Sequence, residues 1–187
     1  MSRQARILLV DDRAENLIAL DAILSTLNQI LVPVRSGEQA LQALLADEFA
    51  VVLLDIVMPG MDGFETAARI KRDAKTRHVP IIFLTAAIAQ PEQAFRGYAA
   101  GGVDYLAKPF DPGVLQAKVS VYVDLYLKAS QLRDQAELLG AVEETVAVLR
   151  QLPAVSKDAE AAEVAARLAG RVGRLRDALD PLGGGHR

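Results

Sequence analysis

Short apolar runs alternate with amphipathic stretches over about the first 110 residues of the chain. Continuous apolar runs are typical of strands that are covered on both faces. Five such runs occur, the last two weaker than the others: 7–10, 51–54, 81–84, 30–34 and 103–106. Between them, apolar residues recur every three or four positions, which predicts helices. These helices cover about 14–27, 37–47, 62–72 and 91–100. Strands alternating with helices predict an α/β domain, with a five-stranded parallel sheet and helices on both faces.

Helical periodicity alone continues beyond Asp111. Pro112 suits the first turn of a helix, because its missing N–H would have no partner there. Apolar residues then form one seam at spacings of three and four: Tyr122, Leu125, Ala129, Leu132, Ala136, Leu139, Val142, Val146 and Leu149. Pro153 interrupts this pattern, so we expect one long helix from residue 112 to about 152. Its apolar seam needs a partner.

A second helix is predicted near the C-terminus. Ser156 is a suitable N-cap, and an apolar stripe continues to about residue 180, followed by a flexible glycine tail. The two helices are expected to form a hairpin or coiled coil, and two hairpins could pair as a homodimer. The sequence therefore predicts a domain over 1–125 and a helical extension over 126–187.

Composition narrows the function classes. The chain has 187 residues, 51% of them hydrophobic, which is enough for a buried core. A net charge of −3 makes nucleic acid an unlikely partner for the whole body. The absence of cysteine excludes disulfides, zinc–thiolate sites and thiol catalysis. No uncharged apolar stretch reaches ~18 residues, so we expect a cytoplasmic protein without a membrane partner.

Polar side chains follow four of the predicted strands. Asp11 and Asp12 come after the first strand, Asp55 after the third, Thr85 after the fourth and Lys108 after the fifth. In a doubly wound, flavodoxin-like sheet with strand order 2-1-3-4-5, the first and third strands are neighbours, and ligands bind at their carboxyl ends. Each residue alone has an ordinary explanation as a helix cap, a strand end or a surface lysine. Their common position at the strand ends predicts one pocket.

The chemistry of this pocket indicates phosphoryl transfer. Three carboxylates repel one another unless a cation lies among them, and an oxygen-only ligand set favours Mg²⁺. A carboxylate can act as the nucleophile, while a hydroxyl and a fixed positive charge can neutralise the phosphoryl oxygens. We therefore expect phosphoryl transfer onto the central carboxylate, Asp55.

Four stretches of the sequence resemble the response-regulator receiver family of two-component signalling, and the resemblance covers about residues 5–125. These stretches are 7–12, 53–63, 83–86 and 104–110. The resemblance implies a switch that receives a phosphoryl group from a histidine kinase, a phosphotransfer protein or a small phosphodonor. It implies no enzymatic activity beyond the protein's own phosphorylation and dephosphorylation.

Individual roles follow from the same resemblance. Asp55 would be the phospho-acceptor, and Lys108 would contact the phosphoryl group. Asp12, Asp55 and the main-chain carbonyl of Val57 would bind Mg²⁺, with Asp11 acting through water.

The resemblance also implies a switch pair. The Thr85 hydroxyl would move towards the phosphoryl group, and the Tyr105 ring would swing inward into the vacated space. The peptide bond between Lys108 and Pro109 is expected to be cis, as is typical of the family.

Two rival functions stay open at this point. The first is a metal-dependent phosphatase or phosphotransferase with an aspartyl intermediate, although such enzymes usually have a second aspartate two residues after the nucleophile, where this chain has Val57. The second is a transcription regulator that binds DNA through the C-terminal helices, against which their modest charge argues. No effector signature follows residue 125, so the output partner is unknown.

Overall fold

The structure of this chain is a computed structural model. The described residues are 3–85, 104–151, 166–167, 170–171 and 174. The helix expected at 91–100, and nearly all of the helix expected at 156–180, lie outside them. The chain divides into two units, residues 1–127 and 128–187, and each is described by itself.

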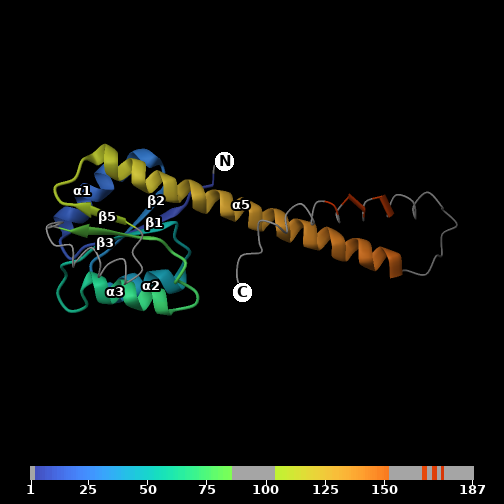
Figure 1. The fold of residues 1–187 in the computed structure, drawn as a ribbon, viewed down its shortest axis with the longest axis horizontal. Helices are drawn as coiled ribbons and strands as arrows, with labels where there is room; N and C mark the ends of the chain where they lie inside the picture. The colour runs from blue at the N-terminus through green and yellow to red at the C-terminus, as the bar shows by residue number, and fades with distance from the viewer. Residues whose placement is uncertain (1–2, 86–103, 152–165, 168–169, 172–173, 175–187) are drawn as a thin grey trace. The chain divides into compact units, whose positions relative to one another are not determined.

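Five parallel strands form one sheet in the first unit (Figure 1). They are β1 (Arg6–Val10), β2 (Ile30–Val34), β3 (Val51–Asp55), β4 (Ile81–Thr85) and β5 (Asp104–Ala107). Their order is β2-β1-β3-β4-β5, which confirms the predicted topology. Asp55 and Thr85 belong to the strands themselves, because their backbones stay in register with Leu84 and Ala107 of the neighbouring strands.

Helices cover both faces of this sheet. They are α1 (Ala14–Leu24), α2 (Gly37–Ala46), α3 (Gly63–Arg72) and the first part of α5 (Pro112–Gln151). Alternate residues of β1 point to opposite faces: Ile7 and Leu9 pack with α1 and α5, whereas Leu8 and Val10 pack with α2 and α3. Burial on both faces explains why the strands are continuous apolar runs.

The helix boundaries follow local capping chemistry. The helix predicted at 14–27 is α-helical only to Leu24 and ends in a 3₁₀ turn over Ser25–Leu27, because Asn28 takes a left-handed conformation with φ of 52°. Asp62 is the N-cap of α3, and its carboxylate accepts the N–H of Glu65 at 2.7 Å. This cap fixes where the loop that leaves β3 turns into α3.

The long C-terminal helix is α5, which runs from Pro112 to Gln151. In the first unit it buries Leu115, Val119 and Val123 against the sheet. In the second unit, Leu132 and Leu138 are 43% and 67% exposed. None of the helices in the described ranges combines the length and apolarity that crossing a membrane requires.

Candidate functional site

The carboxyl ends of β1 and β3 bring three acidic side chains together. One carboxylate oxygen each from Asp11, Asp12 and Asp55 lies within 4.8 Å of the others. Asp11 is fully buried and Asp55 is 7% exposed. The pocket therefore holds negative charge where water can compensate it only in part.

Asp11 is the best-satisfied of the three acids. Its Oδ1 accepts the backbone N–H of Arg13 at 3.0 Å, and the Asn16 amide donates to both of its oxygens at 2.9 Å. Asn16 lies in the first turn of α1, so the start of this helix orients the acid. Sequence reasoning missed Asn16. The signal that could have indicated it is a polar side chain in the first turn of the helix that follows Asp11.

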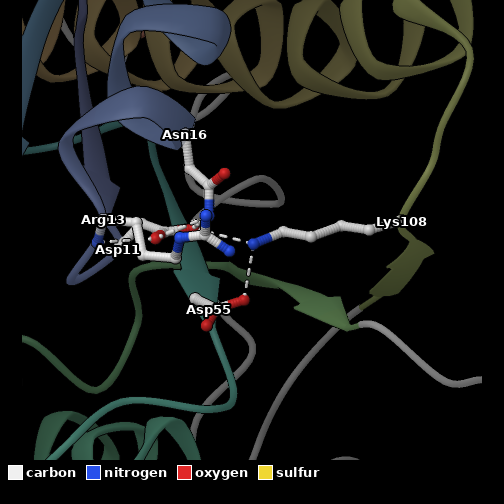
Figure 2. A network of polar contacts seen from close by, with 5 residues as sticks. All are labelled: Asp11, Arg13, Asn16, Asp55 and Lys108. Atoms are coloured by element: carbon white, nitrogen blue, oxygen red, sulfur yellow. Dashed lines mark hydrogen bonds and ion pairs between the residues drawn. The ribbon is translucent and has the colours of Figure 1, made fainter.

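Lys108 bridges two of the acids (Figure 2). Its Nζ lies 2.7 Å from Asp11 Oδ2 and 2.7 Å from Asp55 Oδ1. Its backbone N–H donates to the Thr85 carbonyl at 2.7 Å, which ties the start of the following loop to β4. The bond between Lys108 and Pro109 is cis, as predicted.

The pKa values follow from burial and charge. Burial raises the pKa of Asp55 most, and the negative charge of Asp11 adds to this, while Lys108 and the backbone N–H of Val57 act in the opposite direction. Burial alone would lower the pKa of Lys108, but its bonds to Asp11 and Asp55 outweigh this effect and raise it. The ammonium is thus held in its charged form.

Asp12 is half-buried, and its main-chain carbonyl accepts hydrogen bonds from a residue in the loop that follows β2. The Arg35 guanidinium donates to the Asp12 carbonyl through Nε at 3.2 Å and Nη2 at 3.0 Å. Arg35 follows β2 in the chain, and sequence reasoning missed it, because nothing in the local pattern marks a main-chain contact between residues so far apart. This contact involves the main-chain carbonyl of Asp12 and not its carboxylate.

Glycine is required where α3 approaches the backbone of Asp55. A Cβ on Gly63 would lie 2.3 Å from the Asp55 carbonyl oxygen and 2.8 Å from Ile56 Cα, closer than real Cβ contacts come. The Gly63 N–H also donates to the Ile56 carbonyl at 2.9 Å. Backbone atoms of Asp55 and Ile56 therefore fill the space where a side chain at position 63 would lie.

The predicted switch residues lie on adjacent strands. Thr85 ends β4 and is 6% exposed. Tyr105 on β5 is half-buried, and its ring stacks on Phe83 with centroids 5.4 Å apart. The register pairs Phe83 with Tyr105 and Thr85 with Ala107, so Tyr105 lies diagonally across from Thr85. Their joint movement stays a prediction.

The donor set fits a hard divalent cation. All three side chains offer carboxylate oxygens, and they are close enough to share one ion. The expected fourth ligand, the main-chain carbonyl of Val57, stays a prediction. Val57, two residues after Asp55, is 72% exposed.

Comparison with known proteins agrees with this geometry. Response regulator PleD of Caulobacter vibrioides is 35% identical over 131 residues, which cover 70% of this chain and 29% of PleD. Protein PilH of Pseudomonas aeruginosa is 33% identical over 111 residues, which cover 59% of this chain and 91% of PilH. The chain therefore spans less than a third of PleD but nearly all of PilH.

A solved structure shows the same fold. The receiver domain of a sensor histidine kinase from Pseudomonas aeruginosa, which has a magnesium ion coordinated in its active site cleft, superposes with a TM-score of 0.60 and 32% identity, covering 65% of this chain and 99% of that chain. The family model described as "Response regulator receiver domain" matches residues 7–120. With the acidic pocket at the expected strand ends, the chain belongs to the response regulator receiver family of two-component signalling.

Proposed function

We propose that this protein is a signalling switch that is turned on when Asp55 accepts a phosphoryl group in the presence of Mg²⁺. The observation that carries the proposal is the buried arrangement in which Lys108 bridges Asp11 and Asp55 while three carboxylates share one small space. Phosphoryl transfer needs mainly positioning and charge neutralisation. The fixed carboxylates supply the positioning, and the Lys108 ammonium supplies charge neutralisation.

Each residue of the pocket has a step to perform. An Asp55 oxygen forms a bond to phosphorus as the bond from phosphorus to the donor breaks, and the electron pair leaves with the donor. Lys108 stabilises the charge that develops on the phosphoryl oxygens. Asp11, fixed by Asn16 and the Arg13 N–H, holds the Lys108 ammonium in position. Asp12, Asp55 and the Val57 carbonyl would hold Mg²⁺, with Asp11 acting through water, and the cation would supply further neutralisation of charge.

The response to phosphorylation would involve Thr85 and Tyr105. The Thr85 hydroxyl donates to a phosphoryl oxygen, and Tyr105 takes up the space that this movement leaves. The stacking of Tyr105 on Phe83, which in turn contacts Phe64 of α3 with centroids 5.3 Å apart, gives the ring a defined starting position. The phosphodonor is a histidine kinase, a phosphotransfer protein or a small phosphodonor, and the protein acts in the cytoplasm.

Phosphate uptake tests this function directly. The full chain is incubated with a small acyl phosphate, with and without Mg²⁺, and its intact mass is measured before and after brief acid or base treatment. We expect uptake of one phosphoryl group that requires Mg²⁺ and has the lability of an acyl phosphate. Turnover of phosphate esters without a labelled protein would instead favour the rival phosphatase function.

We further propose that residues beyond the receiver form a dimerisation or output module. Leu132, Leu138 and Val142 of α5 are each at least 40% exposed in the second unit, where exposed apolar side chains are costly. The domain boundary expected at 125, and the helical hairpin, belong to this proposal.

Light scattering tests the dimer. We expect the full chain to have twice the monomer mass and a chain ending at Leu127 to be monomeric, because the shorter chain lacks the exposed residues of the second unit. PilH, which nearly coincides in length with the matched region, supports the expectation that the shorter chain folds. An identical oligomeric state in both chains would contradict a dimerisation role.

A further inference from the structure

Arg13 extends a further positively charged side chain towards the pocket, besides Lys108 and besides Arg35, whose guanidinium donates to the Asp12 main-chain carbonyl. It follows Asp12 directly and precedes the first residue of α1, with extended backbone angles of φ −94° and ψ 119°. Its backbone N–H lies 3.0 Å from Asp11 Oδ1, so the residue is anchored to the pocket. Its side chain is exposed and, in Figure 2, extends from the end of β1 towards the side where Lys108 meets the carboxylates.

Formal charge explains why a cation at this position matters. Among the residues that the structure describes, the three carboxylates and the Lys108 ammonium sum to an excess of two negative charges (−3 and +1). A bound divalent cation would cancel that excess. A doubly negative phosphodonor would then meet a pocket with no net attraction, unless another positive charge lies near the entrance. The guanidinium of Arg35 is already bound to the Asp12 main-chain carbonyl, and Val57 carries no charge.

We propose that Arg13 is a substrate-binding residue that attracts and orients small, doubly charged acyl phosphates for transfer to Asp55. This inference rests on the proposed function of Asp55. In the transfer, an Asp55 oxygen forms a bond to phosphorus, the bond between phosphorus and the acyl oxygen breaks, and the electron pair leaves with the released carboxylate. Arg13 exchanges no proton in this step and acts on the binding of the donor.

The charge of Arg13 predicts opposite effects on the two ligands of the pocket. It attracts the phosphodonor and repels the divalent cation. Removing the charge should therefore slow phosphorylation and, at the same time, tighten Mg²⁺ binding. A merely structural role, exerted through the backbone N–H on Asp11, would weaken both.

The experiment uses the full chain with acetyl phosphate as the donor. The second-order rate constant of phosphorylation is measured by intact mass at saturating Mg²⁺, and the Kd of Mg²⁺ alone is measured by calorimetry. For Arg13→Gln we expect the rate constant to fall and the Mg²⁺ Kd to decrease, each by roughly three- to ten-fold at low salt. High salt should reduce both differences, because it screens exposed charges.

Two further variants are controls. Arg13→Lys keeps the charge and should retain most of the rate. Arg77→Gln removes the same charge from an exposed residue that precedes β4, at the end of the sheet opposite the pocket, and should change neither quantity.

Three outcomes would overturn the proposal. The first is equal rates for Arg13→Gln and Arg77→Gln, and the second is weaker Mg²⁺ binding together with slower phosphorylation in Arg13→Gln. In both cases the wild-type chain is still labelled, so the function of Asp55 stands. Absence of label on the wild-type chain would instead remove the proposed function of Asp55, and the role of Arg13 with it.

Discussion

Replacing Asp55 with asparagine is expected to abolish phosphoryl uptake. An amide is not a nucleophile comparable with a carboxylate, and Asp55 is the acid that lies centrally at the end of β3 and contacts the Lys108 ammonium at 2.7 Å. The measurement is intact mass after incubation with a small acyl phosphate and Mg²⁺. Because burial raises the pKa of Asp55, its charge is unfavourable in the folded protein, and the Asp55→Asn chain should fold with equal or greater stability.

Asp47→Asn is the matched control for this experiment. Its carboxylate side chain is 51% exposed and lies 3.6 Å from Arg6, outside the pocket. The same change from acid to amide should leave uptake unaltered. If the Asp55→Asn chain took up as much phosphate as the Asp47→Asn chain, another residue would be the acceptor.

Replacing Lys108 with methionine should have the largest effect on stability. Without the ammonium, the buried carboxylates of Asp11 and Asp55 face each other uncompensated. Loss of one partner from a buried ionic group costs several kcal/mol, and we expect the free energy of unfolding in metal-free buffer to fall by about 2–4 kcal/mol. Phosphoryl uptake should slow by about 100-fold or more, since one charge-stabilising group is lost. Chemical denaturation and intact mass measure the two effects.

Magnesium should restore part of this lost stability, because a bound cation would neutralise the same carboxylates. Lys118→Met is the control: it breaks the ion pair with Asp104, in which the side chains are 34% and 25% exposed, so that water can solvate the remaining acid. This variant should lose less than about 1 kcal/mol and show no added response to Mg²⁺. Equal losses in both variants would contradict the special role assigned to Lys108.

The arrangement of the strands could be predicted because both faces of the sheet are covered. Double burial makes 51–54 and 81–84 continuous apolar runs, and the intervening helices force parallel connections. Once the strands are parallel, their carboxyl ends share one edge. Because the order 2-1-3-4-5 places β1 beside β3, Asp11, Asp12 and Asp55 then meet at that edge.

The partners that hold the pocket could not be predicted in the same way. The Asn16 amide contacts Asp11 because the first turn of α1 directs this side chain towards the end of β1. Arg35 contacts the Asp12 carbonyl from the loop after β2. Both contacts depend on tertiary distances that local periodicity does not encode. Lys108 was expected to contact a phosphoryl group, and the structure adds that it bridges the carboxylates of Asp11 and Asp55.

The backbone closure at Gly63 has a consequence for how such a switch can diversify. Any side chain at this position would collide with main-chain atoms of Asp55 and Ile56, which cannot rotate away as a flexible side chain could. Val57, two residues after the acceptor, points largely into solvent. Substitutions at Val57 can therefore change the surface beside Asp55 without disturbing the backbone that presents this carboxylate, whereas position 63 has room only for glycine.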